Sequence, residues 1–250
     1  MAQIIAPLIV GNWKMNGLRA SLPEVEKLAG LLAQKQPGCR VALCPPATLL
    51  APMIRIAAPA GILVGAQDCS ADAPGAHTGD ISAAMIADAG AQMVIVGHSE
   101  RRTDHGETDD LVRRKALAAI GAGLTPIICV GETRAERDAG QASAVVARQM
   151  AASVPDEAAA AEIVVAYEPV WSIGTGLTPT TGDIEQMHKS IRDQMVGRFG
   201  ERGAVVPILY GGSLKPGNAQ QILAIAEVNG GLVGGASLLA DDFAAIIWAA

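Results

Sequence analysis

The stretch MVIVGHSERRTDHGETDDLVRRKALAAIGAGLTPIICV, residues 93–130, decides the fold class. It begins and ends with short apolar runs, at 93–96 and 125–130, in which polar residues do not alternate. Strands with this pattern are covered on both faces, as in a parallel sheet. The residues between them show helical spacing, at Leu111, Val112, Lys115, Ala116, Ala119 and Ile120. The stretch therefore predicts a strand, a helix and a second strand parallel to the first.

The same alternation continues in both directions along the chain. Eight apolar runs have strand character, at 8–10, 41–44, 62–64, 93–96, 125–130, 163–167, 205–210 and 231–233. Right-handed crossovers repeated eight times can close a parallel sheet into a barrel, and such barrels are typically about 250 residues long. The chain has 250 residues. We therefore expect an α/β fold, a single (β/α)8 barrel domain over 1–250 with eight parallel strands surrounded by helices.

An open, doubly wound sheet is the competing α/β architecture. It usually carries a GxGxxG turn after its first strand or a GxxxxGK[ST] phosphate loop. The first apolar run is followed instead by Gly11-Asn12-Trp13-Lys14, and no Pro-, Ser- or Gly-rich linker divides the chain. These features favour the barrel.

The composition indicates which binding partners and which cellular compartment to expect. The formal net charge is −6 and basic residues form no long run, so we expect no nucleic-acid partner. The apolar stretches fall short of the roughly 18 residues that a membrane span needs, and residues 1–10 lack the pattern of a signal peptide. The four cysteines lack zinc-ligand spacing. We expect a cytoplasmic protein with reduced thiols and no bound metal.

Seven polar side chains follow predicted strands where a barrel would carry its reactive groups. They are Asn12 and Lys14 after the first run, Gln67 after the third, His98 and Glu100 after the fourth, Glu132 after the fifth and Glu168 after the sixth. In barrels of this kind the reactive face lies at the carboxyl ends of the strands. An amide, an ammonium, an imidazole and a carboxylate are therefore expected at one mouth.

Glu168 is followed by a segment with the composition of a lid. Pro169 restricts one end of 169–176 and the glycines around Thr175 free the other, while Val170, Trp171 and Ile173 give it an apolar underside. An exposed acid beside an ordinary buried loop is the alternative. A closing lid would exclude water and make the carboxylate more basic by removing its solvation.

His98 and Lys14 each have an ordinary alternative. A lone histidine is more often structural, but a short helix starting near Ser99 would favour a neutral imidazole, which can still donate one hydrogen bond to a carbonyl oxygen. Lys14 could be a plain surface ammonium. Its place two residues after a strand end indicates instead a charge that attracts an anionic substrate.

Paired glycines after the last two runs indicate a phosphate site. They occur in YGGS at 210–213 and GGAS at 234–237. Tight turning accounts for one glycine at each place but less easily for two. Glycine lets backbone N–H groups approach a ligand closely, and the loops after strands seven and eight are the recurrent phosphate site of barrels.

One connection, residues 67–82, is unusually long. Long loops in compact domains are usually functional or disordered. This one contains Gly, Ala, Thr and His with little charge, which favours burial against a partner.

Six motifs in order across the chain resemble the triosephosphate isomerase family. They are GNWKMN at 11–16, GHSERR at 97–102, CVGET at 129–133, AYEPVWSIGTG at 166–176, YGGS at 210–213 and LVGGASL at 232–238. The resemblance implies a TIM barrel that interconverts dihydroxyacetone phosphate and D-glyceraldehyde 3-phosphate through an enediolate, without a cofactor. It implies a place in glycolysis and gluconeogenesis, with a link to the pentose phosphate shunt.

The resemblance also implies residue roles. Glu168 matches the family's base, and His98 matches the group that polarises the carbonyl and moves protons between the oxygens. Asn12 and Lys14 match residues that bind substrate and stabilise the enediolate, with Glu100 as a supporting acid. The phosphate-binding positions that match are Gly174, Ser213, Gly234 and Gly235.

The sequence departs from the family pattern at four positions. Ser172 stands where Ala is usual, Leu177 where Lys is common, His77 where an aromatic residue is frequent, and Asn229 where Asp is common. The first two bear on lid kinetics and His77 on subunit contact. The 67–82 loop still resembles the segment that docks into a second subunit, so we expect a homodimer.

Two rival functions remain open from the sequence. One is another phosphosugar isomerase or epimerase on the same fold. The other is an inactive barrel that binds phosphate ligands. The intact set of Asn12, Lys14, His98 and Glu168 argues against the second.

Overall fold

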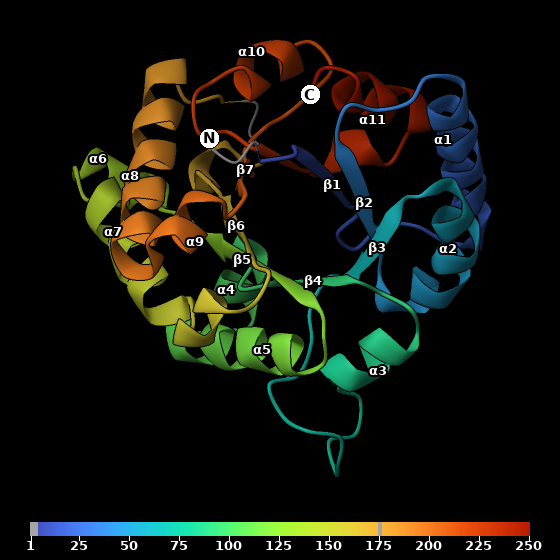
Figure 1. The fold of residues 1–250 in the computed structure, drawn as a ribbon, viewed down its shortest axis with the longest axis horizontal. Coiled ribbons are helices and arrows are strands. Elements are labelled where there is room, and N and C mark those ends of the chain that lie inside the picture. Colours follow the sequence, from blue (N-terminus) through green and yellow to red (C-terminus); the bar gives the residue numbers. More distant parts are fainter. Residues whose placement is uncertain (1–4, 175–176) are drawn as a thin grey trace.

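Eight parallel strands close into a barrel, as expected (Figure 1). The computed structural model describes residues 5–174 and 177–250. Each strand pairs with the next along the chain, and β8 pairs with β1. The strands are β1 (Leu8–Asn12), β2 (Arg40–Cys44), β3 (Leu63–Ala66), β4 (Met93–Val96), β5 (Thr125–Val130), β6 (Val164–Tyr167), β7 (Ile208–Tyr210) and β8 (Gly230–Val233).

Helices surround the barrel and connect the strands (Figure 1). The α-helices are α1 (Leu22–Gln34), α2 (Leu50–Ala57), α3 (Ala83–Asp88), α4 (Ser99–Asp104), α5 (Asp109–Gly121), α6 (Arg134–Asp138), α7 (Ala142–Ser153), α8 (Thr181–Phe199), α9 (Glu201–Ala204), α10 (Ala219–Leu223) and α11 (Ala240–Ile247). The short 3₁₀ turns are η1 (Arg19–Ser21), η2 (Ala47–Leu49), η3 (Ala58–Ala60), η4 (Asp156–Ala159), η5 (Val170–Ser172) and η6 (Gly235–Ser237).

Local sequence signals start several of these helices. The Thr108 hydroxyl accepts a hydrogen bond from the Leu111 amide and begins α5, whose first turn carries two aspartates. Thr180 and Asp183 form a reciprocal capping box at the start of α8. Such caps satisfy amides that have no partner within the helix. The helix expected around 111–120 is thus present, with a defined first residue.

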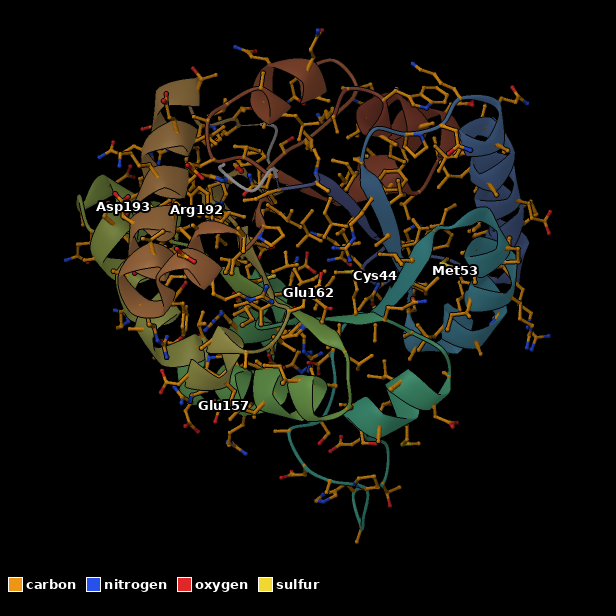
Figure 2. The ribbon with its side chains drawn as sticks, in the orientation of Figure 1. Cys44, Met53, Glu157, Glu162, Arg192 and Asp193 are labelled. Carbon is orange, nitrogen blue, oxygen red and sulfur yellow. The ribbon has the colours of Figure 1, made fainter. Side chains whose placement is uncertain are left out.

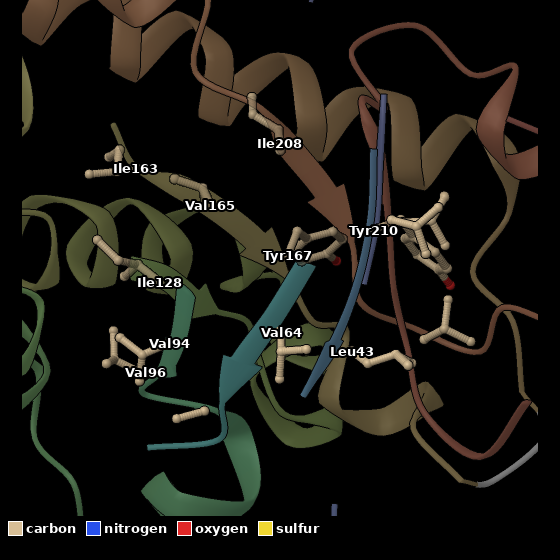
Figure 3. Packing of buried hydrophobic residues seen from close by; sticks show 14 of the residues in the cluster. Leu43, Val64, Val94, Val96, Ile128, Ile163, Val165, Tyr167, Ile208 and Tyr210 are labelled. Carbon is tan, nitrogen blue, oxygen red and sulfur yellow. The ribbon is translucent and has the colours of Figure 1, made fainter. Parts of the chain in front are cut away.

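The hydrophobic core has two layers separated by the barrel wall. Side chains that alternate along the strands fill the barrel interior, namely Leu8, Val10, Ala42, Cys44, Met93, Ile95, Ile127, Cys129, Val164, Ala166, Leu209 and Leu232. The other side chains of the strands pack outward against the helices (Figure 3). Figure 2 shows the contrast between Cys44, inside the barrel, and Asp193, on the exposed face of α8. The expectation that both faces of the strands are covered is confirmed.

Two differences from the expected elements have simple causes. The strand expected over 205–210 begins only at Ile208, because Val205 ends helix α9. The long connection over 67–82 projects beyond the ring of helices between β3 and α3 (Figure 1), with Ser70 and Ser82 bridged at its base. Within the described part of the chain, none of the helices combines the length and apolarity needed to cross a membrane.

Candidate active site

A cavity of about 560 Å³ lies at the carboxyl ends of the strands. The eight residues predicted to carry catalysis and phosphate binding line it, namely Asn12, Lys14, His98, Glu168, Gly174, Ser213, Gly234 and Gly235. They come from the ends of β1, β4, β6, β7 and β8 and from the segment after Glu168. The fold therefore brings together side chains that are more than 200 residues apart in the chain.

The carboxylate of Glu168 is buried and both of its oxygens have partners. Oε1 lies 2.9 Å from Nε2 of His98. Oε2 accepts a hydrogen bond of 2.9 Å from the backbone amide of Ser99. Glu168 is 2% exposed and His98 is 5% exposed. The base and the imidazole expected from the sequence are thus in direct contact in this state.

Gly97 and the start of α4 place the imidazole of His98. Gly97 has a φ of +67°, and a Cβ there would lie 2.7 Å from the side chain of Val112, so the turn requires glycine. His98 then serves as the N-cap of α4, with Nδ1 accepting from the Glu100 amide at 3.3 Å. Because Nδ1 accepts, the hydrogen-bond pattern assigns the ring proton to Nε2, which faces Glu168.

The two groups shift each other's pKa in opposite directions. Burial raises the pKa of Glu168, but the charge and hydrogen bond of His98 and the Ser99 amide outweigh it, so the net pKa is lowered. Burial lowers the pKa of His98, but the charge of Glu168 outweighs it, so the net pKa is raised. The neutral imidazole expected from the helix terminus is therefore opposed here by Glu168. That opposition ends when the carboxylate is protonated or moves away.

Lys14 occupies a strained backbone conformation at the mouth of the cavity. Its φ is +51°, which is uncommon for a residue with a side chain. Its amide donates to Oδ1 of Asn12 at 2.9 Å, and its carbonyl accepts from Nε2 of Gln67 at 2.8 Å. Its Nζ lies 2.5 Å from Oε1 of Glu100. These contacts hold an ammonium at the cavity and explain how Glu100 supports it.

The segment after Glu168 is tied to a buried carboxylate that sequence reasoning gave no role. Oε1 of Glu132 accepts from Nε1 of Trp171 at 2.9 Å and from the Tyr167 hydroxyl at 3.1 Å, and Arg137 lies 3.1 Å away. Glu132 is fully buried. This contact fixes η5 beside the barrel. Residues 175 and 176, the far end of the expected lid, lie outside the described residues.

The other end of the cavity has room for an anionic group. Ser213 follows β7, and Gly234 and Gly235 follow β8 at the start of η6. A Cβ at Gly235 would meet no atom within 4 Å, so this surface is open. The first N–H groups of a helical turn have no partner within the turn and suit an anion. Lys215 also lines this end of the cavity.

Sequence reasoning missed two contributors, the backbone amide of Ser99 and the side chain of Lys215. It placed Gln67 and Glu132 at this face but not their partners, which are the Lys14 carbonyl and the side chains of Tyr167 and Trp171. Position after a predicted strand was a usable signal for Gln67 and Glu132. A backbone amide gives no sequence signal, and Lys215 lies beyond the glycine pair.

A second cavity, of about 500 Å³, lies at the amino-terminal end of the barrel beside the end of α1. Its lining includes Cys39 and Arg40 but neither a carboxylate nor an imidazole. It therefore does not compete as a site for proton transfer. The described residues contain no group of three or more His, Cys, Asp or Glu side chains that could hold a metal ion.

Comparisons with known proteins agree on one family. The family model for triosephosphate isomerase matches residues 7–250. A protein named triosephosphate isomerase from Afipia carboxidovorans is 62% identical over 97% of this chain and 96% of its own length. One of the same name from Rhodopseudomonas palustris is 59% identical over 98% of each chain. The crystal structure of triosephosphate isomerase from Bartonella henselae is 46% identical, covers 98% of this chain and 99% of its own, and superposes with a TM-score of 0.91. The chain therefore belongs to the triosephosphate isomerase family.

Proposed function

We propose that the cavity at the carboxyl ends of the strands interconverts dihydroxyacetone phosphate and D-glyceraldehyde 3-phosphate by proton transfer. Membership of the family makes the chain an isomerase. The observation that carries the proposal is the convergence of Glu168, His98 and Lys14 on one cavity, with glycine loops at its other end. A carboxylate, a hydrogen-bond donor and an ammonium are the groups that an enediolate intermediate requires.

The chemistry follows from what each group can donate or accept. Glu168 takes a proton from the carbon next to the carbonyl and returns it to the neighbouring carbon. Nε2–H of His98 donates to the carbonyl oxygen, and the imidazole moves the proton between the two substrate oxygens. Lys14 and Asn12 stabilise the negative charge that develops there. The net result exchanges an aldehyde for a ketone, with every proton accounted for.

Glu168 cannot act as a strong base while both of its oxygens are paired. Its lowered pKa reflects the contacts with His98 and the Ser99 amide. Substrate binding between Glu168 and His98 would break these contacts, and a closed lid would remove the remaining water. Both changes raise the basicity of the carboxylate when a carbon-bound proton must be removed.

The phosphate end of the cavity orients the substrate. Gly174, Ser213, Gly234 and Gly235 are proposed to hold the phosphate through backbone amides and a hydroxyl. No cofactor or metal is required, since the base, the donor and the cation all come from side chains. Fixing the phosphate directs binding energy to the reacting carbons.

Replacement of Glu168 by Gln tests the proposal. The E168Q variant keeps the size of the side chain but cannot accept a proton, so turnover of triose phosphates should fall by roughly 10²–10⁴ or more. Affinity for glycerol 3-phosphate should change little, since the phosphate contacts remain. The matched control E185Q changes an exposed glutamate on α8 and should keep full turnover.

Four results would contradict the assignment in different ways. Equal activity in E168Q would remove Glu168 from its role. Turnover of only a larger sugar phosphate by the unaltered chain would support another isomerase or epimerase. Phosphate binding without any turnover would support an inactive barrel. During turnover in deuterium oxide, substrate hydrogen should be replaced by deuterium, whereas strict retention would indicate hydride transfer.

We also propose that two copies of the chain associate through the 67–82 loop. Three apolar side chains around this loop are exposed, Met15 at 97%, Met85 at 56% and Ile81 at 36%. Gln67, at the start of the loop, donates to the Lys14 carbonyl beside Met15. An apolar patch around a projecting loop favours a protein partner. A second copy is the partner that the family resemblance implies.

Two further proposals concern organisation and compartment. A single domain over 1–250 is supported by the barrel, because its strands run from Leu8 to Val233 and every strand pairs with both neighbours. A cytoplasmic location is supported by the four cysteines, all of which are free thiols, the state that reducing compartments maintain.

A further inference from the structure

The guanidinium of Arg102 connects the ends of two strands beside the segment that leads into His98. Arg102 is on α4, whose N-cap is His98. Its Nε donates to the Gly97 carbonyl at 2.8 Å, and its Nη2 donates to the Cys129 carbonyl at 3.2 Å. Gly97 directly follows β4, and Cys129 is the last residue but one of β5. The guanidinium therefore joins the two strands where they reach the carboxyl end of the barrel.

Two further side chains fix the orientation of this guanidinium. Nη1 donates to Oδ1 of Asp109 at 2.6 Å, and Nη2 also donates to Oγ of Ser153 at 3.1 Å. Oγ of Ser153 in turn donates to the same Oδ1 at 3.1 Å. Asp109 begins α5, and Ser153, which is 0% exposed, ends α7. Because a guanidinium is planar and rigid, these contacts also fix the directions of its bonds to the two carbonyls.

The peptide between Gly97 and His98 depends on such an external contact. Gly97 has a φ of +67°, and glycine adopts positive and negative φ about equally readily. Rotation of this peptide would turn both the side chain of His98 and the amide of Ser99. These are the two groups that contact Glu168, each at 2.9 Å. Arg102 therefore holds the segment that carries both contacts, although it is not among the described residues that line the cavity.

We propose that Arg102 is a positioning residue, which holds the Gly97 peptide, and through it the imidazole of His98, in the orientation that proton transfer requires. The proposal rests on the proposed function, since His98 is the group that Arg102 serves. Displacement of a reacting group by about 1 Å can cost roughly 100-fold in rate. The fork of the guanidinium is the property that matters, because one rigid group reaches both carbonyls and Asp109 at once, whereas a lysine ammonium is a point charge.

Two other roles would use the same contacts differently. Arg102 could act through its charge alone. Burial and the charge of Glu168 raise the pKa of the Cys129 thiol, whereas the charge of Arg102 lowers it, so both charges act on the same part of the barrel. A lysine would preserve this effect. Alternatively, Arg102 could support only the fold by joining α4, α5 and α7, which would change the stability but not the rate per folded molecule.

The experiment compares R102K and R102M with the unaltered chain and with R114M. R102K keeps the charge without the fork, and it remains informative if R102M, which leaves Asp109 without its cation, fails to fold. In both variants kcat for triose phosphates should fall about 10- to 100-fold, while the affinity for glycerol 3-phosphate should stay within about 2-fold, because the phosphate end of the cavity is unaltered. The control R114M removes an exposed arginine of α5 that pairs with Asp110, and it should change neither quantity.

The ring nitrogens of His98 provide a readout that does not require turnover. With 15N-labelled histidine, the His98 signals are identified by their absence in H98N and compared at a pH at which titration shows a neutral ring. The unaltered chain and R114M should show one tautomer with the proton on Nε2, because Nδ1 accepts from the Glu100 amide. In R102K the two nitrogen shifts should move toward each other, as both tautomers become populated. This measurement decides the proposal even if the unaltered chain does not interconvert triose phosphates.

Four results would overturn the proposal. A normal kcat in R102K would show that the charge alone is sufficient. Unchanged His98 nitrogen shifts in R102K would show that Arg102 does not act through the imidazole, even if kcat falls. Equal losses of kcat/KM and of glycerol 3-phosphate affinity would indicate distortion of the whole cavity. A lower unfolding temperature with normal kcat and normal shifts in both variants would leave Arg102 with a role in the fold only.

Discussion

His188 shows how strongly burial alone can determine the charge of a single residue. It lies on α8 with its ring 0% exposed, and Nδ1 is 3.1 Å from the Glu227 carbonyl. Burial lowers its pKa to about 4, because a charged imidazole loses its solvation. His188 shares the buried face of α8 with apolar residues such as Ile184 and Ile191.

The lowered pKa of His188 predicts a loss of stability in mild acid. As the pH falls below about 6.5 the unfolded chain takes up a proton, whereas the folded chain does not until about pH 4. This contribution is therefore complete above pH 6.5 and is lost as the pH falls toward 4. Between pH 7 and pH 5 it should lower the free energy of unfolding by about 2 kcal/mol.

The H188N variant isolates this effect. Asparagine keeps a donor for the Glu227 carbonyl but has no group that titrates in this range. Urea unfolding at pH 7 and pH 5, at one protein concentration, should show a fall that is about 2 kcal/mol smaller in the variant. Equal falls in the two proteins would mean that His188 is charged in the folded chain.

Single residues at strand ends were predictable, but their pairing was not. Asn12, Lys14, His98 and Glu168 were found because strand periodicity and the barrel rule locate the reactive face. That both oxygens of Glu168 are occupied depends on the Ser99 amide and on rotamers. The positive φ of Lys14 likewise depends on Gln67, a residue of the 67–82 loop whose side chain donates to the Lys14 carbonyl. Such contacts are set by packing between distant segments.

At the scale of elements, Arg192, which Figure 2 labels on α8, connects this helix to the segments that precede β7 and β8. Its guanidinium donates to the carbonyls of Gly203 and Val206 at 2.7 and 2.8 Å. It also donates to Oδ1 of Asn229 and to Oε2 of Glu227, each at 2.8 Å. Asn229, one of the departures from the family pattern, thus still accepts from this arginine.

Replacing Arg192 by Met should therefore destabilise the fold. The variant leaves two carbonyls and the Glu227 carboxylate without this donor, although Oδ1 of Asn229 still accepts from the Ile208 amide, and its free energy of unfolding should fall by about 3 kcal/mol. The matched control is R198M on the same helix, where the partner Asp156 is 73% exposed, and it should cost at most about 1 kcal/mol. Chemical denaturation of both variants checks this. Similar losses of unfolding free energy in R192M and R198M would show that helix propensity, rather than the loss of buried donors, causes the destabilisation.

Elements were predictable where their apolar pattern is long enough. All eight strands and the helix around 111–120 are present, because buried runs and helical spacing are strong signals. The boundaries were less certain, as the late start of β7 shows. Short helices such as α6, with 5 residues, contain too few apolar positions to show a period.

At the scale of the whole molecule, the barrel accounts for its own core but not for the apolar surface around the 67–82 loop. Met15 and Met85 are exposed, although each lies next to residues that the fold holds firmly. The number of strands predicted the closed barrel, because closure is an intramolecular property. A subunit contact depends on a second surface, so the sequence supports it through the loop's length and composition and its resemblance to the family's docking segment.

Removal of the loop tip tests the proposed dimer. Ser70 and Ser82 are bridged, and the Ser70 amide donates to the Ile81 carbonyl, so the ends of the tip are close together. Replacing 71–81 by a short Gly/Ser linker should leave the barrel folded while removing the projecting surface. In sedimentation equilibrium, the unaltered chain should have twice the 25.6 kDa mass of one chain. The shortened chain should have the mass of a single shortened chain.

Charge introduced at the same surface should act in the same direction as the shortened loop. The M85R variant places a cation where we expect an apolar contact, and it should dissociate at concentrations at which the unaltered chain does not. The matched control is V196R, which alters a side chain on α8 that is 40% exposed, and it should stay associated. Dissociation should also lower kcat/KM, because Gln67 at the base of the loop holds the Lys14 carbonyl in its strained conformation. If the shortened chain still sediments as a dimer, the subunit contact lies elsewhere. If the unaltered chain sediments as a monomer, the dimer proposal is wrong, but the proposed chemistry of the cavity does not depend on it.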